Sequence, residues 1–168
     1  VEGSYKPEGN GNNFLFKLLG VNSVAVVKGG SDMMGKMEKK AEALKSEGKK
    51  PYIVPGGASN AIGALGYAVC GEETMTQIND MRLKIDHIVV PSGSAGTHAG
   101  MVVGMKGVNG CIPISGVNVS RPKEVQEEIV FKLAGETTAK LGIGGIVARD
   151  DIVCFDQYVG PGYSIPTD

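Results

Sequence analysis

The chain has 168 residues with 17 basic and 18 acidic side chains, so its net charge is −1. This balance disfavours a nucleic-acid surface as the main function, and no apolar run reaches the ~18 residues that a membrane span needs. Glycine is the outlier, because its 26 residues are about twice the usual share. The glycines show no collagen period and accompany full apolar runs, so they indicate a fold with many tight turns and close backbone approaches.

The chain begins with Val1 and a polar stretch, and no signal peptide opens it. We therefore expect a cytoplasmic protein that is a processed or truncated product. The three cysteines, Cys70, Cys111 and Cys154, are widely spaced and form no CxxC pair. We expect them to be buried free thiols, with no metal site and no disulfide framework.

Apolar patterning predicts helices that alternate with strands. Helices are expected at 14–19, 31–48, 59–78, 97–105 and 122–141, and strands at 23–28, 51–55, 87–90, 112–119 and 152–155. Short connections between such elements predict an α/β fold, an open and mostly parallel sheet with helices on both faces.

Two of these helices have a recognisable apolar side. The helix expected at 31–48 should present Met33, Met37, Ala41 and Leu44 on this side, with Ser31 as its N-cap. The last is expected to present Val125, Ile129, Leu133 and Leu141.

The most informative stretch is 87–100, HIVVPSGSAGTHAG, where a predicted strand runs through small residues into a helix. Small residues let the backbone approach an anion, and the amides of a helix N-terminus point at it. Ser92, Ser94 and Thr97 add hydroxyl groups. The stretch matches neither the P-loop nor the strict dinucleotide motif, so a small phosphate monoester fits best. The alternative is a tight strand–helix turn that binds nothing.

Other polar residues allow two interpretations each. In 55–66, Ser59 and Asn60 stand at a helix start, where Asn60 could face the same crevice or cap the helix. Arg121 follows a strand and could hold a carboxylate or cap a helix. His98 is expected to pack rather than to contact a ligand, and His87 is expected to be structural.

Four stretches, at 51–67, 89–104, 116–121 and 158–167, together resemble the pyridoxal phosphate (PLP) enzymes of the D-cysteine desulfhydrase and aminocyclopropane-carboxylate (ACC) deaminase family in order and spacing. Residues 10–20 also fit this family. The resemblance implies the type II PLP fold, with 1–50 in the small α/β domain and 51–168 in the large PLP-binding α/β domain. It also implies a homodimer in the full-length protein and a small amino acid as substrate. No nucleic-acid or membrane partner is expected, from the charge and hydropathy given above.

The resemblance assigns functional residues as well. Ser94, Ala95, Gly96 and Thr97 match the loop that holds the PLP phosphate, and Tyr163 matches a substrate-facing tyrosine. Asn60, at the second strand–helix junction, is expected from its position to be a further cofactor contact. The implied reaction is β-elimination of D-cysteine to pyruvate, sulfide and ammonia. Alternatives are ACC deamination, cysteate lyase activity, and a non-catalytic module that binds a phosphate or PLP.

Three family segments have no match in this sequence. They are the Gly-Gly-Asn-Lys segment with the Schiff-base lysine, the Ser-Asn-His-type segment after it, and the Asp-Pro-Val-Tyr-type segment near the family's C-terminus. Lys28 precedes Gly29 and Gly30, which is the reverse order. We therefore expect this chain to be the middle of such an enzyme and to be inactive alone.

Overall fold

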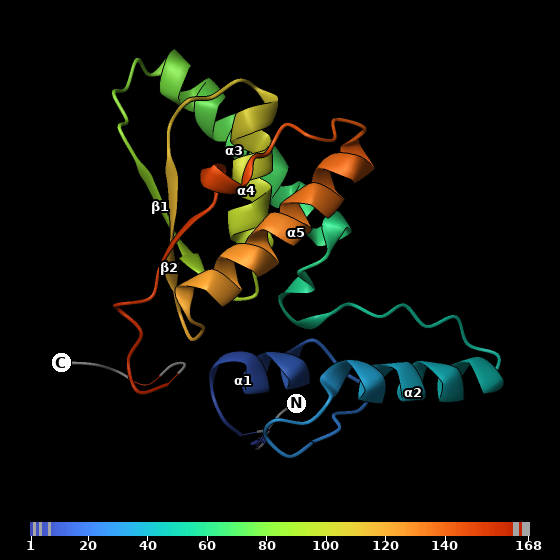
Figure 1. The fold of residues 1–168 in the computed structure, drawn as a ribbon. Helices are drawn as coiled ribbons and strands as arrows, with labels where there is room; N and C mark the ends of the chain where they lie inside the picture. The colour runs from blue at the N-terminus through green and yellow to red at the C-terminus, as the bar shows by residue number, and fades with distance from the viewer. Residues whose placement is uncertain (2, 4, 7, 163–164, 166–168) are drawn as a thin grey trace. The chain divides into compact units, whose positions relative to one another are not determined.

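The computed structural model describes residues 1, 3, 5–6, 8–162 and 165 (Figure 1). The chain divides into two compact units, Val1–Ile53 and Val54–Asp168, which are described separately below. The assignment of 1–50 and 51–168 to the small and large domains of the PLP enzymes stays a prediction.

The first unit contains two helices, α1 (Gly11–Leu18) and α2 (Met33–Ser46). The predicted apolar side of α2 is confirmed, because Ala41 is buried and Met33, Met37 and Leu44 are half-buried. The helix begins one residue later than expected: the carboxylate of Asp32, not Ser31, caps it by accepting a hydrogen bond from the Gly35 amide at 2.9 Å. Such a cap satisfies one of the free amides of the first turn.

The strands predicted at 23–28 and 51–55 are wrong. Within 23–28 only Val27 forms an isolated bridge: it donates to the carbonyl of Val1 at 2.8 Å and accepts from the Gly3 amide at 2.8 Å. Val26 and Val54 are exposed. The N-terminal amino group of Val1 also donates to the Ala25 carbonyl at 2.7 Å, so residues 23–28 pair with the N-terminal stretch, but this pairing is too short to form a strand ladder. No described strand pairs with 51–55.

The second unit is built on a parallel sheet with the order β1-β2-β3. Its strands are β1 (Ile88–Ser92), β2 (Ile114–Asn118) and β3 (Val153–Phe155), so three predicted strands are confirmed with shifted ends. Val90, Gly116 and Cys154 lie side by side in register. The parallel register brings the carboxyl ends of β1 and β2 to one edge, where ligands of open α/β sheets bind.

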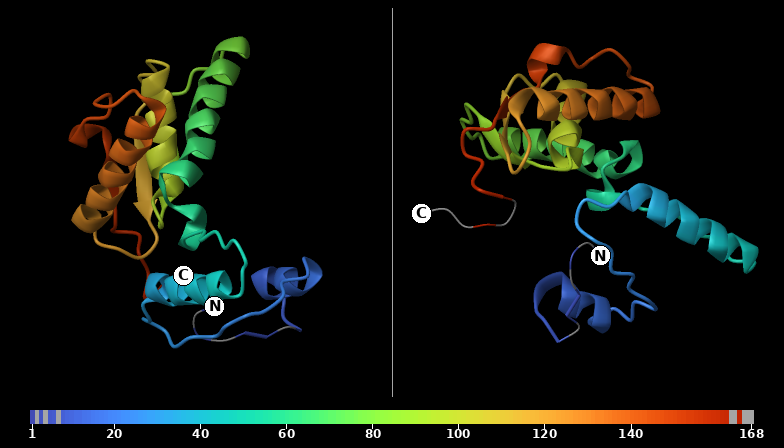
Figure 2. Two further views of the ribbon diagram at one scale, coloured as in Figure 1. Left: turned by 90° about the vertical axis from the view of Figure 1, so that its right-hand side faces the viewer. Right: turned by 60° about the horizontal axis from the view of Figure 1, so that its bottom comes forward.

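Three helices, α3 (Ala61–Asp80), α4 (Gly96–Gly107) and α5 (Lys123–Leu141), lie together on one side of this sheet (Figure 1). Helix α4 lies between α3 and α5 (Figure 2). The parallel α/β fold is thus confirmed, while helices cover one face of the sheet in the part that the structure describes. On the other face Val89 is 65% exposed and Phe155 is 36% exposed.

Close contact between α3 and α4 depends on two glycines. A Cβ atom on Gly100 would lie 2.4 Å from the Ala64 carbonyl oxygen, and one on Gly104 would lie 2.0 Å from that of Ala68. Both distances are too short for any side chain, so glycine lets the two helix backbones touch. The buried core around this contact consists of alanine, valine, isoleucine, leucine and methionine side chains.

The apolar side predicted for α5 is only partly confirmed: Leu133 is buried and Ile129 is half-buried against the core, whereas Val125 and Leu141 are exposed. The buried side consists of Gln126, Val130, Leu133, Ala134, Thr137 and Thr138. It includes polar side chains because each of these finds a hydrogen-bond partner: Thr137 donates to the Leu133 carbonyl at 2.7 Å, and Gln126 has several partners given below.

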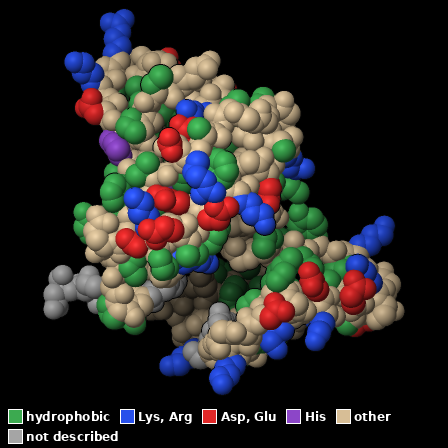
Figure 3. All heavy atoms as spheres, in the orientation of Figure 1, with side chains coloured by type: hydrophobic (Ala, Val, Ile, Leu, Met, Phe, Trp, Pro, Cys, Tyr) green, Lys and Arg blue, Asp and Glu red, His purple; other side chains and the backbone are tan. Residues whose placement is uncertain are grey.

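The cysteines are free, as expected, but only Cys154 is buried; Cys70 is half-buried and Cys111 is exposed. The expectation of three buried thiols was therefore wrong. No described helix is both long enough and apolar enough to cross a membrane. Basic and acidic side chains are interspersed on the face seen in Figure 3, which agrees with the near-neutral net charge.

Candidate phosphate-binding site

The loop between β1 and α4 offers unpaired backbone donors. Ala95 has a left-handed backbone (φ 79°) and is buried, so the chain turns sharply into the helix at this residue. In the described part of the chain the amides of Ser94, Ala95, Thr97 and His98 have no hydrogen-bond acceptor. Free amides at a helix N-terminus form a ready site for an anion such as a phosphate.

The second strand–helix junction lies against this loop. The Ser59 hydroxyl accepts a hydrogen bond from the Gly96 amide at 3.2 Å. Gly57 lies so close to Ser94 that a Cβ atom on it would be 2.3 Å from the Ser94 hydroxyl, and its φ of 68° also favours glycine. The structure therefore brings together two junctions that are more than 30 residues apart in the sequence.

Asn60 caps α3, because its side-chain oxygen accepts from the Gly63 amide at 2.8 Å. This is one of the two roles that its position in the sequence allows. A contact between Asn60 and a cofactor stays a prediction. Tyr163, the predicted substrate-facing residue, lies outside the described residues.

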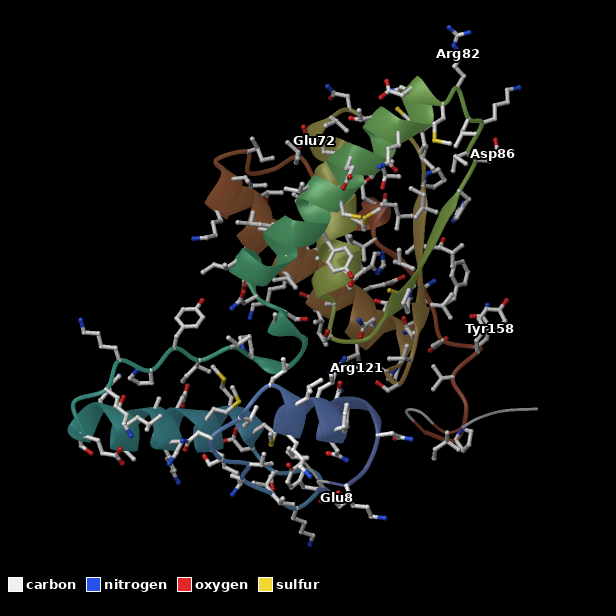
Figure 4. The ribbon with its side chains drawn as sticks, turned by 180° about the vertical axis from the view of Figure 1, so that it is seen from behind. Glu8, Glu72, Arg82, Asp86, Arg121 and Tyr158 are labelled. Atoms are coloured by element: carbon white, nitrogen blue, oxygen red, sulfur yellow. The ribbon has the colours of Figure 1, made fainter. Side chains whose placement is uncertain are left out.

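A cavity of about 420 Å³ opens beside the loop, within the size range of small-molecule sites. It is lined by Gly57, Pro91, Gly93, Ser94, Val119, Ser120 and Arg121. Arg121 supplies the charge of this lining, and Figure 4 shows it on the loop side of the second unit. A cavity that contains one guanidinium group, two serine hydroxyls and a free amide suits an anionic group.

Arg121 does not cap α5, whose N-cap residue is Pro122, while a role in holding a carboxylate stays a prediction. Its Nη1 atom donates to the Gly93 carbonyl at 2.5 Å and to Oε1 of Gln126 at 3.2 Å. Its own carbonyl accepts from Nδ2 of Asn118 at 2.9 Å. Arg121 therefore ties the end of β2 and the start of α5 to the loop after β1.

A buried polar chain continues from Gln126 into the core. Nε2 of Gln126 donates to the Ser92 hydroxyl at 2.9 Å and to the Gly93 carbonyl at 3.0 Å. Ser92 also contacts Nδ1 of His98 at 3.1 Å. The Ser92 hydroxyl can donate to Nδ1 or accept from it according to the imidazole tautomer, and Nε2 of His98 is buried without a partner among the described residues.

Two titratable side chains of this hydrogen-bonded network, His98 and Cys154, are held in their neutral forms. Burial lowers the pKa of His98 to about 4. Burial first, and then the nearby Glu127 carboxylate, raises the pKa of the Cys154 thiol to about 11. His98 thus packs in the first turn of α4, as predicted, with its ring against Gly116.

Sequence reasoning missed Gln126. The available signal is its spacing of four and seven residues from Val130 and Leu133, which puts a polar side chain on the buried stripe of α5. The apolar side predicted from Val125 leaves Gln126 off the buried side of the helix, so this spacing was not recognised as a signal.

A family model described as "Pyridoxal-phosphate dependent enzyme" matches residues 5–168. The chain belongs to this family. The fold class and the resemblance that the sequence suggested are thereby confirmed, and the cofactor of family members is PLP.

Curated relatives narrow the comparison within the PLP-dependent enzymes. The chain is 37% identical over 159 residues to a D-cysteine desulfhydrase of Yersinia enterocolitica, covering 95% of this chain and 47% of the relative. It is 33% identical to a D-cysteine desulfhydrase of Salmonella typhi with the same coverage. The chain therefore spans about half the length of the curated relatives it matches.

A solved structure agrees with these relatives. The crystal structure of an ACC deaminase homologue superimposes with a TM-score of 0.71 at 29% identity, over 92% of this chain and 46% of that one. This member of the PLP-dependent enzyme family is thus related to the D-cysteine desulfhydrase and ACC deaminase enzymes.

Proposed function

We propose that this chain is the phosphate-binding part of a PLP-dependent carbon–sulfur lyase that eliminates sulfide from D-cysteine. The observation that carries the proposal is the loop of free amides from Ser94 to His98, in a chain 37% identical to a D-cysteine desulfhydrase. PLP carries a phosphate monoester, so the loop has the chemistry that one end of the cofactor needs.

The residues of the site fit PLP. The amides of Ser94, Ala95 and Thr97 would hold the phosphate, and the hydroxyls of Ser94 and Thr97 would add donors. Gly57 and Gly96 leave room for close approach, because a Cβ atom on either would be within 3 Å of a serine hydroxyl. When bound, the pyridine ring supplies an electron sink for the pair of electrons left by the α-proton.

The test measures the binding of PLP to the purified chain by titration calorimetry. Unphosphorylated pyridoxal is the comparison ligand. Gly57→Ala is expected to weaken PLP binding by at least about tenfold, because the added methyl group would collide with Ser94 and occupy the cavity. Gly56→Ala is the matched control, since nothing lies within 4 Å of its Cβ position. Equal binding of PLP and pyridoxal would overturn the proposed phosphate site.

Turnover is a separate matter. Because the Gly-Gly-Asn-Lys segment has no match in the sequence, we assign no proton transfer to this chain and expect no sulfide from D-cysteine when PLP is added. An assay for released sulfide, run beside an assay for ammonia from ACC, tests this expectation. Full activity of the chain alone would show that a lysine outside such a segment forms the bond to the cofactor.

The same missing segment favours a second candidate, a module that binds a phosphate or PLP without catalysis. Borohydride reduction distinguishes the two, because it fixes a cofactor that is joined to a lysine. PLP binding with no attached pyridoxyl group after reduction supports the module for this chain. A single labelled lysine, located by mass spectrometry, supports the lyase.

A further inference from the structure

The peptide that joins Gly93 to Ser94 is held from outside the loop. The Gly93 carbonyl accepts two hydrogen bonds, from Nη1 of Arg121 at 2.5 Å and from Nε2 of Gln126 at 3.0 Å. Arg121 and Gln126 also bind one another at 3.2 Å. Figure 4 shows Arg121 at this end of the second unit.

Holding this carbonyl fixes the direction of an amide. The 93–94 peptide bond is trans, and in a planar trans peptide the C=O and N–H groups point in opposite directions. With the Gly93 carbonyl fixed on Arg121 and Gln126, the Ser94 N–H is fixed as well. That N–H has no acceptor among the described residues, and Ser94 lines the cavity.

The same side chains restrain both ends of the loop. Gln126 is fully buried and donates to the Ser92 hydroxyl at 2.9 Å, before the loop. Ser92 contacts His98 at 3.1 Å, after the loop. Residues 93–97 are therefore held between two anchored positions, and free donors in a fixed arrangement bind an anion without a further ordering cost.

We propose that Arg121 and Gln126 are positioning residues of the phosphate site, which orient the Gly93–Ser94 peptide so that the Ser94 amide is ready for the anion. The inference rests on the proposed function, because it assumes that the loop binds a phosphate. It adds two residues of the β2–α5 segment to a site that otherwise consists of the loop and the α3 junction.

The test follows amide resonances of the ¹⁵N-labelled chain by NMR during titration with inorganic phosphate. Arg121→Met is expected to shift the Ser94 amide before any phosphate is added and to weaken phosphate binding about tenfold, the effect of losing one charge-assisted hydrogen bond. Arg121→Lys, which keeps a donor, should recover part of the affinity. Arg149→Met is the matched control, because it removes an equal charge from an exposed residue that pairs with Glu128.

Gln126→Met provides a variant without a change in charge. It should give the same shift of the Ser94 amide and the same direction of affinity change. Since Gln126 is fully buried, circular dichroism must show that this variant is folded, and Arg121→Met decides the matter if it is not.

Each contrary result has its own meaning. If the parent chain binds no phosphate, the proposed function fails, and the role of Arg121 and Gln126 in phosphate binding fails with it. If the parent binds phosphate and Arg121→Met binds it equally, only the positioning role is overturned. If affinity falls while the ligand-free Ser94 resonance stays unchanged, Arg121 contacts the phosphate directly, and positioning is again overturned.

Discussion

Two β-branched runs of this chain look alike in sequence and differ in structure. Residues 23–28 and β1 are both short and rich in valine, and both precede a helix. The first has no fully buried residue and makes only a short pairing with the N-terminal stretch, whereas β1 pairs with β2 along its length and buries Val90 beneath the helices. Strand formation therefore depends here on a partner strand and a covering helix rather than on residue preference.

The largest effect is expected at the helix contact that covers the sheet. Gly104→Ala should lower the free energy of unfolding by more than about 3 kcal/mol, beyond the usual range for overpacking, because the new methyl group would lie 2.0 Å from the Ala68 carbonyl oxygen. Urea unfolding followed by circular dichroism measures the loss.

Gly135→Ala in α5 is the matched control for this variant. Nothing lies within 4 Å of its Cβ position, so the change should stabilise the protein by about 0.5–1 kcal/mol through helix propensity alone. Equal effects of the two substitutions would show that α3 and α4 do not touch as the structure has them.

The second largest effect is the pH dependence of the unfolding free energy, to which only the second unit contributes histidines. Both histidines lie in residues 54–168, and burial lowers the pKa of His98 from 6.5 to about 4. The unfolded chain therefore binds a proton that the folded chain refuses, so stability is fully present above pH 6.5 and falls as the pH drops toward 4. The loss attributable to His98 is about 3 kcal/mol at most.

Comparing unfolding free energies at pH 7.5 and 4.5 in the parent and in His98→Gln measures this loss. The variant should show a smaller difference between the two pH values. A parent-like slope in His98→Gln would mean that carboxylates alone cause the acid sensitivity.

The smallest effect compares the two runs themselves. Val90→Ala should cost about 2 kcal/mol, because it removes buried methyl groups, whereas Val26→Ala should cost less than about 0.5 kcal/mol, because Val26 is 50% exposed. Urea unfolding of both variants gives the two values. A large cost for Val26→Ala would mean that residues 23–28 do form a strand in the folded protein.

Much of the candidate site was predictable because it is local in sequence. A strand, a run of small residues and a helix start follow one another from Ile88 to Gly96, so the free amides could be anticipated from order alone. The contact between Ser59 and Gly96 and the bonds from Arg121 and Gln126 to Gly93 could not be. They join residues 28 to 37 positions apart, and no local pattern encodes such a distance.

The sequence by itself determined the α/β class, the family and the position of the loop that we propose binds an anion, since these follow from the alternation of elements and from short motifs. Only the tertiary structure decided which β-branched runs became strands, which side of α5 was buried and which side chains hold the loop. The physical reason is the same in each case. Strand pairing, helix packing and buried hydrogen bonds gain their free energy from partners distant in the chain, and partners exist only once the chain has folded.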